Sequence, residues 1–173
     1  MATKKSGDTF ANIAYLSVIE SAANTLTFAA LQLATTLMTE KAALIIHRAE
    51  FNLTNLAVLN STTDYTDICL TVSDRLTAAH DLSAPELLFF RRTQRIDFGT
   101  AASGVFRDDP VAVDFTSLPG GGIIVPADRL YVGVCSVGAS NPNGVQMRLF
   151  YTVRSLEIAD YWDLVEARRV MTT

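Results

Sequence analysis

The sequence predicts an all-β domain, an antiparallel sandwich or barrel of about eight strands, followed by one helix. Three observations lead to this prediction. Apolar and polar residues alternate along much of the chain between residues 25 and 154, which is the period of a half-buried strand. Turn-forming residues separate the alternating segments. No helical segments recur between the strands, so the crossovers of a parallel sheet are missing.

The 173 residues are enough for one domain with arms. We expect residues 1–9, with Lys4 and Lys5, to form a flexible arm, residues 10–154 the β domain, and residues 155–173 a helix and tail. No apolar run approaches the ~20 residues of a membrane span. The N-terminus also lacks the apolar segment of a signal peptide. We therefore expect neither a membrane span nor secretion.

The first segment, from residue 10 to residue 25, fits two patterns. Ile13, Leu16 and Ile19 fit a helical stripe, whereas Ala14, Leu16 and Val18 fit one face of a strand, and the sequence leaves both open. Residues 25–33 are β-prone.

Residues 41–53 predict the clearest strand. One face is expected to carry every second residue from Ala43 to Leu53, His47 included. The opposite face begins with Leu44 and Ile46 and then becomes polar. This pattern indicates a strand that is buried on both faces at its start and on one face toward its end, where it reaches an exposed rim.

The middle of the chain predicts a strand near residues 64–74, with Ile68, Leu70 and Val72 on its inner face. Ser83 is a candidate N-cap for a helical turn over residues 85–90, because Pro85 suits the first helical position. Residues 91–98 are then expected to form a strand.

In the C-terminal third, strands are expected at 111–115, 123–125, 129–137 and 145–154, with a break at 118–122 and a turn at 138–144. Residues 155–171 predict a helix with Ile158, Tyr161, Trp162 and Val165 on one stripe. Acidic residues precede the arginines at its end, as the helix macrodipole favours.

The composition indicates burial against other molecules. Hydrophobic residues make up 49% of the chain and charged residues 18%, below the roughly 25% of an average domain. A small monomer needs polar side chains to cover its surface, so oligomerisation is the better explanation. Arginine far outnumbers lysine, which is typical of interfaces, although codon usage in a GC-rich genome explains it equally well. The net charge of −4 predicts no general polyanion-binding surface.

No set of residues predicts catalysis or cofactor binding. His47 lies on an apolar strand face and is expected to be a hydrogen-bonded core or interface residue. His80 and Asp81 could pair, but no nucleophile-elbow pattern accompanies them. Cys69 and Cys135 are expected to be reduced thiols in strands.

Two loop features have weak functional interpretations. Asp108, Asp109 and Asp128 could bind calcium between subunits, but they lack the spacing of a calcium loop and are better explained as solvated turn residues. The glycines at 120–122 precede no Lys-Ser or Lys-Thr pair, so we interpret them as a connection between strands and not as a phosphate-binding loop.

Arg91, Arg92 and Arg95 form the one basic cluster of the sequence. On a strand, Arg91 and Arg95 share a face and Arg92 points to the other. One hypothesis is that this face contacts nucleic acid or an acidic neighbour. A solvated rim is an equally good interpretation.

The segments 118–134 and 145–153 resemble the closing strands of single jelly-roll capsid proteins of icosahedral viruses. This resemblance implies a structural, non-enzymatic virion protein, assembled in the host cytoplasm from copies of itself, with other capsid proteins as further possible partners. The arm holds two lysines, so the resemblance implies weak or no direct contact with the genome. The proposed subunit interface is the terminal helix, through Tyr161, Trp162, Val165 and Arg168.

An alternative is a trimeric jelly-roll module that binds a receptor or a carbohydrate. It would require a cleft lined by aromatic residues, for which Phe89, Phe90, Tyr131 and Tyr151 are available. These four residues stand where strands need core residues. A helix that covers its own barrel is the alternative to an inter-subunit helix.

Overall fold

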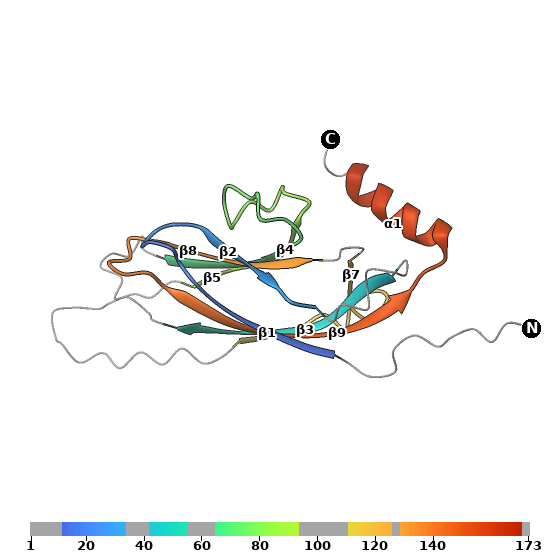
Figure 1. The fold of residues 1–173 in the computed structure, drawn as a ribbon, viewed down its shortest axis with the longest axis horizontal. Coiled ribbons are helices and arrows are strands. Elements are labelled where there is room, and N and C mark those ends of the chain that lie inside the picture. Colours follow the sequence, from blue (N-terminus) through green and yellow to red (C-terminus); the bar gives the residue numbers. More distant parts are fainter. Residues whose placement is uncertain (1–11, 34–41, 55–64, 94–110, 126–128, 171–173) are drawn as a thin grey trace, which may run out of the picture.

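The computed structural model describes residues 12–33, 42–54, 65–93, 111–125 and 129–170. The described residues form nine strands and one helix, arranged as two stacked antiparallel sheets (Figure 1). The elements are β1 (Asn12–Ile19), β2 (Thr27–Leu31), β3 (Ala42–Thr54), β4 (Tyr65–Thr71), β5 (Leu87–Thr93), β6 (Val111–Asp114), β7 (Ile123–Val125), β8 (Leu130–Val137), β9 (Gly144–Ser155) and α1 (Ile158–Val170). The all-β prediction is confirmed.

The order of the strands defines a jelly roll. One sheet has the order β1-β9-β3-β6, and the other has the order β2-β8-β4-β5. The first strand therefore pairs with the last, and the second pairs with the last but one. Such pairing wraps a long hairpin into a double-sheet sandwich. The predicted jelly roll is thus confirmed by the topology itself.

The ninth strand arises because one jelly-roll strand is interrupted. β6 pairs with the second half of β3, from Arg48 to Phe51, and β7 pairs with the first half, from Leu44 to Ile46. The chain leaves the ladder between β6 and β7 at the predicted break, where Gly120 and Gly121 have positive φ. The expected count of about eight strands corresponds to the jelly roll with this interruption.

His47 marks a β-bulge that changes the predicted pattern of β3. The pairing with β9 shifts between Ile46 and Arg48. Because a bulge inserts one residue, the side chains facing the core change from the even to the odd positions. Leu44 and Ile46 precede the bulge in the core cluster, and Ala49, Phe51 and Leu53 follow it. The prediction of one continuous odd-numbered face was wrong, although burial on both faces at the start of β3 is confirmed by Ala43 and Ile45.

The segment at 10–25 is a strand and not a helix. Ala14 and Val18 of β1 are buried, whereas Ile13 and Ile19 are exposed. β1 pairs with β9 over its whole length. The alternation therefore decides the structure of this segment, and the helical stripe is coincidental.

Two predicted boundaries were wrong. The helical turn expected at 85–90 is limited to one hydrogen-bonded turn, from the Leu87 amide to the Ala84 carbonyl, because β5 already begins at Leu87 and pairs with β4 through its Leu and Phe residues. Aromatic and aliphatic side chains suit a strand that finds a partner. The terminal helix begins at Ile158, three residues later than expected, because β9 continues to Ser155.

The core lies between the two sheets. Its largest fully buried side chains come from both layers and include Tyr151, Leu149 and Val145 of β9, Ile68 and Leu70 of β4, and Val132 and Val134 of β8. The predicted inner face of β4 is confirmed by this cluster, which holds Ile68 and Leu70 with Val72 packed against it.

Candidate functional site

Helix α1 projects away from the sandwich beyond the end of β9 (Figure 1). Its first intrahelical hydrogen bond runs from the Tyr161 amide to the Glu157 carbonyl, at 3.0 Å. Ile158 and Trp162, one turn apart, are 55% and 53% exposed. A half-exposed Trp on a protruding helix leaves a large apolar side chain in water when the protein is a monomer. Such a residue is typical of an interface anchor.

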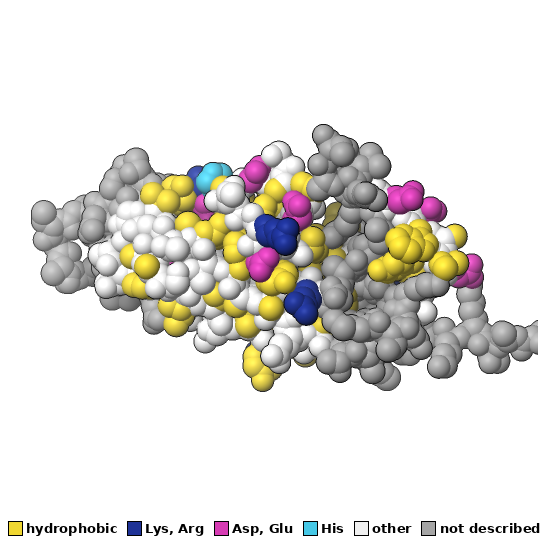
Figure 2. Space-filling model, turned by 45° about the horizontal axis from the view of Figure 1, so that its top comes forward, with side chains coloured by type: hydrophobic (Ala, Val, Ile, Leu, Met, Phe, Trp, Pro, Cys, Tyr) yellow, Lys and Arg dark blue, Asp and Glu magenta, His cyan; other side chains and the backbone are white. Residues whose placement is uncertain are grey.

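The surroundings of this stripe are acidic. Glu157, Asp160, Asp163 and Glu166 of this segment are all exposed, and Glu166 lies one turn beyond Trp162. Figure 2 shows acidic side chains beside an apolar patch at the end of the molecule where α1 lies. The Tyr161 and Trp162 rings meet edge to face, with centroids 5.9 Å apart. Of the predicted interface residues, the side chains of Val165 and Arg168 lie outside the described residues.

A second apolar surface lies on the outer face of the β1–β9–β3 sheet. We call it the β1 patch, and it consists of Ile13, Tyr15 and Ile19 of β1 with Phe150 of β9. Tyr15 is 84% exposed. Phe150 lies opposite Ile13 in the β1–β9 register.

Arginines border the β1 patch. The Arg48 guanidinium lies 5.8 Å from the centre of the Phe150 ring. Arg48 and Arg148 share the Glu50 carboxylate, at 2.7 and 3.6 Å. Exposed aromatic residues beside arginines are the composition of a protein–protein interface. Sequence reasoning missed this surface, although the presence of apolar residues on both faces of β1 was the signal for it.

Of the predicted basic face of Arg91 and Arg95, the structure describes Arg91 alone. Arg91 is opposite the core residue Ile68 in the β4–β5 register, so it lies on the inner face of its sheet and not on a solvated rim. Its Nε donates to Thr93 Oγ1 at 3.4 Å. Arg95 lies outside the described residues.

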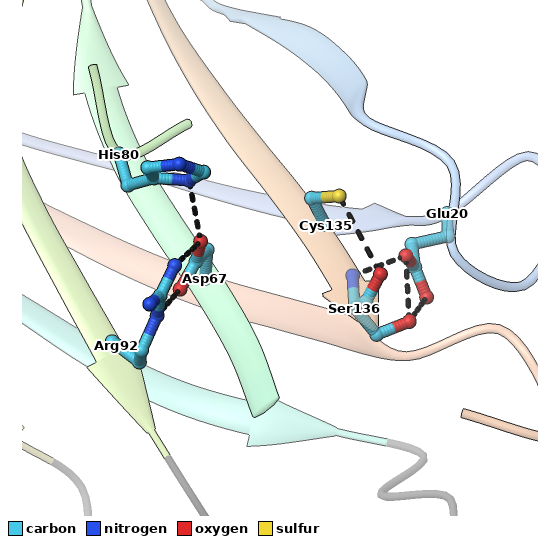
Figure 3. A network of polar contacts seen from close by, with 6 residues as sticks. All are labelled: Glu20, Asp67, His80, Arg92, Cys135 and Ser136. Carbon is cyan, nitrogen blue, oxygen red and sulfur yellow. Dashed lines mark hydrogen bonds and ion pairs between the residues drawn. The ribbon is translucent and has the colours of Figure 1, made fainter. Parts of the chain in front are cut away.

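Arg92, on the outer face, binds Asp67 instead of a partner molecule (Figure 3). Its Nε and Nη2 donate to the two Asp67 oxygens, each at 2.8 Å, and its guanidinium stacks on Tyr65 at 3.6 Å. The pKa of Arg92 is raised, chiefly by this hydrogen bonding to Asp67. His80 Nδ1 donates to the same carboxylate at 3.2 Å. The candidate pair of His80 with Asp81 is therefore replaced by His80 with Asp67.

A second buried carboxylate, that of Glu20, joins the end of β1 to β8 and β9 (Figure 3). It accepts hydrogen bonds from the Ser136 amide and hydroxyl and from the Asn143 amide, at 2.6 to 2.8 Å. These donors compensate a buried charge and fix the end of the sandwich. Both Glu20 and Asp67 have a structural role in this arrangement.

The remaining candidate residues are also bound within the fold. His47 Nδ1 donates to the Gly121 carbonyl at 2.8 Å, and its Nε2 is hydrogen-bonded to Thr152 Oγ1 at 2.9 Å. Cys69 and Cys135 are free thiols. Burial raises the pKa of Cys69 to about 12 and also raises that of Cys135, which makes both poor nucleophiles.

Neither a metal site nor an aromatic cleft emerges from these residues. Within the described ranges, no three His, Cys, Asp or Glu side chains are grouped to hold a metal ion, and no helix is long and apolar enough to cross a membrane. The aspartates at 108, 109 and 128 lie outside those ranges. Tyr151 is buried, and Phe89 stacks on Phe51 at 5.0 Å, so two of the four aromatics needed for a binding cleft belong to the core.

Comparisons with known proteins found similarity in structure. No family model and no curated protein matches the sequence. VP1 of the Trichodysplasia spinulosa-associated polyomavirus aligns over 88% of this chain and 97% of its own, with 10% identity and a TM-score of 0.48. The human polyomavirus 6 VP1 pentamer aligns over 91% and 99%, with 11% identity and a TM-score of 0.47. The structure of tomato aspermy virus aligns over 91% and 85%, with 12% identity and a TM-score of 0.45. The resemblance to viral capsid proteins is thus confirmed as a similarity of fold.

Proposed function

We propose that this chain is a non-enzymatic structural subunit of a virion, which packs against copies of itself to form an icosahedral shell. One observation carries the proposal: the described chain exposes two separate apolar surfaces, the α1 stripe and the β1 patch, on an otherwise well-packed jelly roll. A subunit in a closed shell contacts neighbours on more than one side, so two such surfaces are expected of it. A monomer would expose both to water.

In this proposal α1 is the inter-subunit lock. It follows the core strand β9 directly but leaves the sandwich, and Trp162 and Ile158 of the helix have no buried position in the monomer. The chemistry of the other polar residues supports the structural role, because Asp67, Glu20 and His47 are occupied in holding the fold together. Assembly in the host cytoplasm and participation of other capsid proteins belong to the same proposal.

The proposed shell does not hold its genome through the terminal arm. Only Lys4 and Lys5 contribute positive side chains there, and counterion release scales with the number of phosphates neutralised. Arg91 faces inward and Arg92 is paired. Charge reversal of Arg91 should therefore leave the nucleic-acid content of purified particles unchanged. A marked fall in that content would contradict this part of the proposal.

Removal of residues 156–173 tests the lock. The deletion ends the chain after β9 and takes away none of the buried core residues. We expect a folded β-rich protein by circular dichroism that no longer forms particles in negative-stain images.

Trp162→Ala should likewise reduce the number of particles formed. Leu82→Ala is the control, because Leu82 is a large hydrophobic residue that is even more exposed, at 78%, and lies in the loop between β4 and β5. Intact particles from the truncated chain would refute the lock.

A further inference from the structure

We propose that α1 of one copy docks on the β1 patch of a neighbouring copy. The inference rests on the proposed self-assembly and identifies the two surfaces that meet. Each is apolar and unpartnered: the helix presents Ile158 and Trp162, and the sheet presents Ile13 and Tyr15. When the two surfaces dock, both are removed from water by one contact per subunit. Burial stabilises the contact by on the order of 25 cal/mol per Å² of apolar area covered.

The charges of the two surfaces are complementary. Exposed carboxylates lie around the helix stripe: Glu166 lies one turn beyond Trp162, Glu157 and Asp163 lie toward its two sides, and Asp160 lies on the opposite face of the helix. On the β1 patch, Arg148 lies opposite Tyr15, and the carboxylate that it shares, Glu50, is held more closely by Arg48, at 2.7 Å against 3.6 Å, so Arg148 can pair with a carboxylate of a neighbouring copy.

Asp114 of β6 lies directly opposite Arg48, and Thr116 donates to it through its amide and hydroxyl, so Glu50 and Asp114 are both matched to Arg48 and Arg148 is the arginine next to β1. Opposed charges across an interface guide association and exclude wrong pairings. By the same rule two α1 helices repel each other, because each would bring the same acidic flanks.

The dimensions agree as well. A helix of 13 residues is about 20 Å long at 1.5 Å per residue. A strand of eight residues is about 26 Å long at 3.3 Å per residue. The helix can therefore lie along β1, with Trp162 beside Tyr15, without extending past the sheet.

The contact must join different copies. In Figure 1, α1 stands on the side of the β2–β8–β4–β5 sheet, whereas the outer face of the β1–β9–β3 sheet points the opposite way. A contact between two different surfaces is heterologous, so each copy uses its helix on one neighbour and its patch on another. Repetition of such a contact closes a ring or a shell.

Charge exchange gives a first test on the full chain. Arg148→Glu should abolish particles, because it places a carboxylate against the acidic flank of α1. Adding Asp163→Arg and Glu166→Arg to the same chain should restore them. Arg75→Glu, at an exposed position in the loop between β4 and β5, is the control and should leave assembly unchanged.

Disulfide trapping decides between the possible contacts. Three variants are made in a Cys135→Ser background. Ser17→Cys places a thiol on the outer face of β1, and Ile158→Cys places a thiol on the helix stripe. Ser140→Cys places a thiol in the exposed turn between β8 and β9. Mild oxidation of particles assembled from a mixture of Ser17→Cys and Ile158→Cys chains should give covalent dimers. Either variant alone, or Ile158→Cys mixed with Ser140→Cys, should give none.

The outcomes separate this inference from the proposed function. Dimers from Ile158→Cys alone would show helix-to-helix contact, and dimers from Ser17→Cys alone would show sheet-to-sheet contact. Either result, or particles without any mixed dimer, overturns the docking and leaves the shell intact as a proposal. Absence of particles from the unsubstituted chain overturns both.

Discussion

Asp67 shows how single residues of this chain serve the fold. Asp67 is 1% exposed, and its carboxylate accepts hydrogen bonds from the half-exposed Arg92 and from His80. The buried role of Asp67 could not be predicted from the sequence, because an aspartate in an alternating strand is normally interpreted as a solvent-exposed residue. Only the pairing of β4 with β5 brings the arginine to it, and that pairing is set by the tertiary structure.

Replacement of Arg92 should destabilise the protein. Arg92→Ala removes the guanidinium that binds the buried Asp67 carboxylate and leaves it the hydrogen bond to His80, and we expect a loss of about 2–4 kcal/mol in the free energy of unfolding. Arg91→Ala is the matched control on the same strand, since Arg91 makes a single 3.4 Å hydrogen bond to Thr93. Urea denaturation of both variants measures the difference. Equal stabilities would contradict a structural role for the Asp67 pair.

Cys69 should be inert in the folded protein. Burial raises its pKa from 9.0 to about 12, so at pH 8 almost no thiolate is present. We expect Ellman's reagent to modify Cys69 only after unfolding. Rapid native labelling of a Cys135→Ser variant, which retains Cys69 as its thiol, would contradict this environment.

The same raised pKa has a consequence for stability. Because the folded state holds the Cys69 proton more tightly than the unfolded state, its contribution is full below pH 9 and is lost as pH rises toward 12. Stability should therefore fall less steeply above pH 9 in Cys69→Ala than in the unsubstituted protein.

At the scale of elements, alternation predicted most strands, and its failures have local causes. β3 changes its core face at His47, because the bulge inserts one residue there. A bulge is fixed by cross-strand partners, here the interrupted pair β6 and β7, which periodicity within β3 cannot reveal. The ambiguous segment at 10–25 carries apolar residues on both faces because one face meets the core and the other forms the β1 patch.

Gly133 tests the packing of β8 against its neighbours. A Cβ there would lie 2.6 Å from both Cys69 Sγ and Phe28 Cε1, atoms contributed by the two flanking strands. We expect Gly133→Ala to cost about 1–3 kcal/mol through overpacking. Ser17→Ala, on the exposed face of β1, is the control and should be close to neutral. Thermal unfolding of the two variants gives the comparison, and a neutral Gly133→Ala would contradict the close approach.

At the scale of the whole molecule, the sequence indicated the jelly roll through its strand count and its closing segments. The pairing of the first strand with the last could not be predicted and was revealed by the structure. The terminal helix was predicted from its period, but the surface it could meet was not. The β1 patch joins residues of β1 and β9 that are more than 120 positions apart in the chain, and no local pattern links them.

The mass of the particles formed by the full chain tests self-assembly most directly. Sedimentation velocity of the purified protein should show a single fast boundary, and sixty copies of an 18.8 kDa chain correspond to about 1.1 MDa for the smallest icosahedral shell. Electron microscopy of the same fraction should show closed particles of one diameter. A boundary at one or three subunits over the whole concentration range, with no particles in the images, would contradict the account.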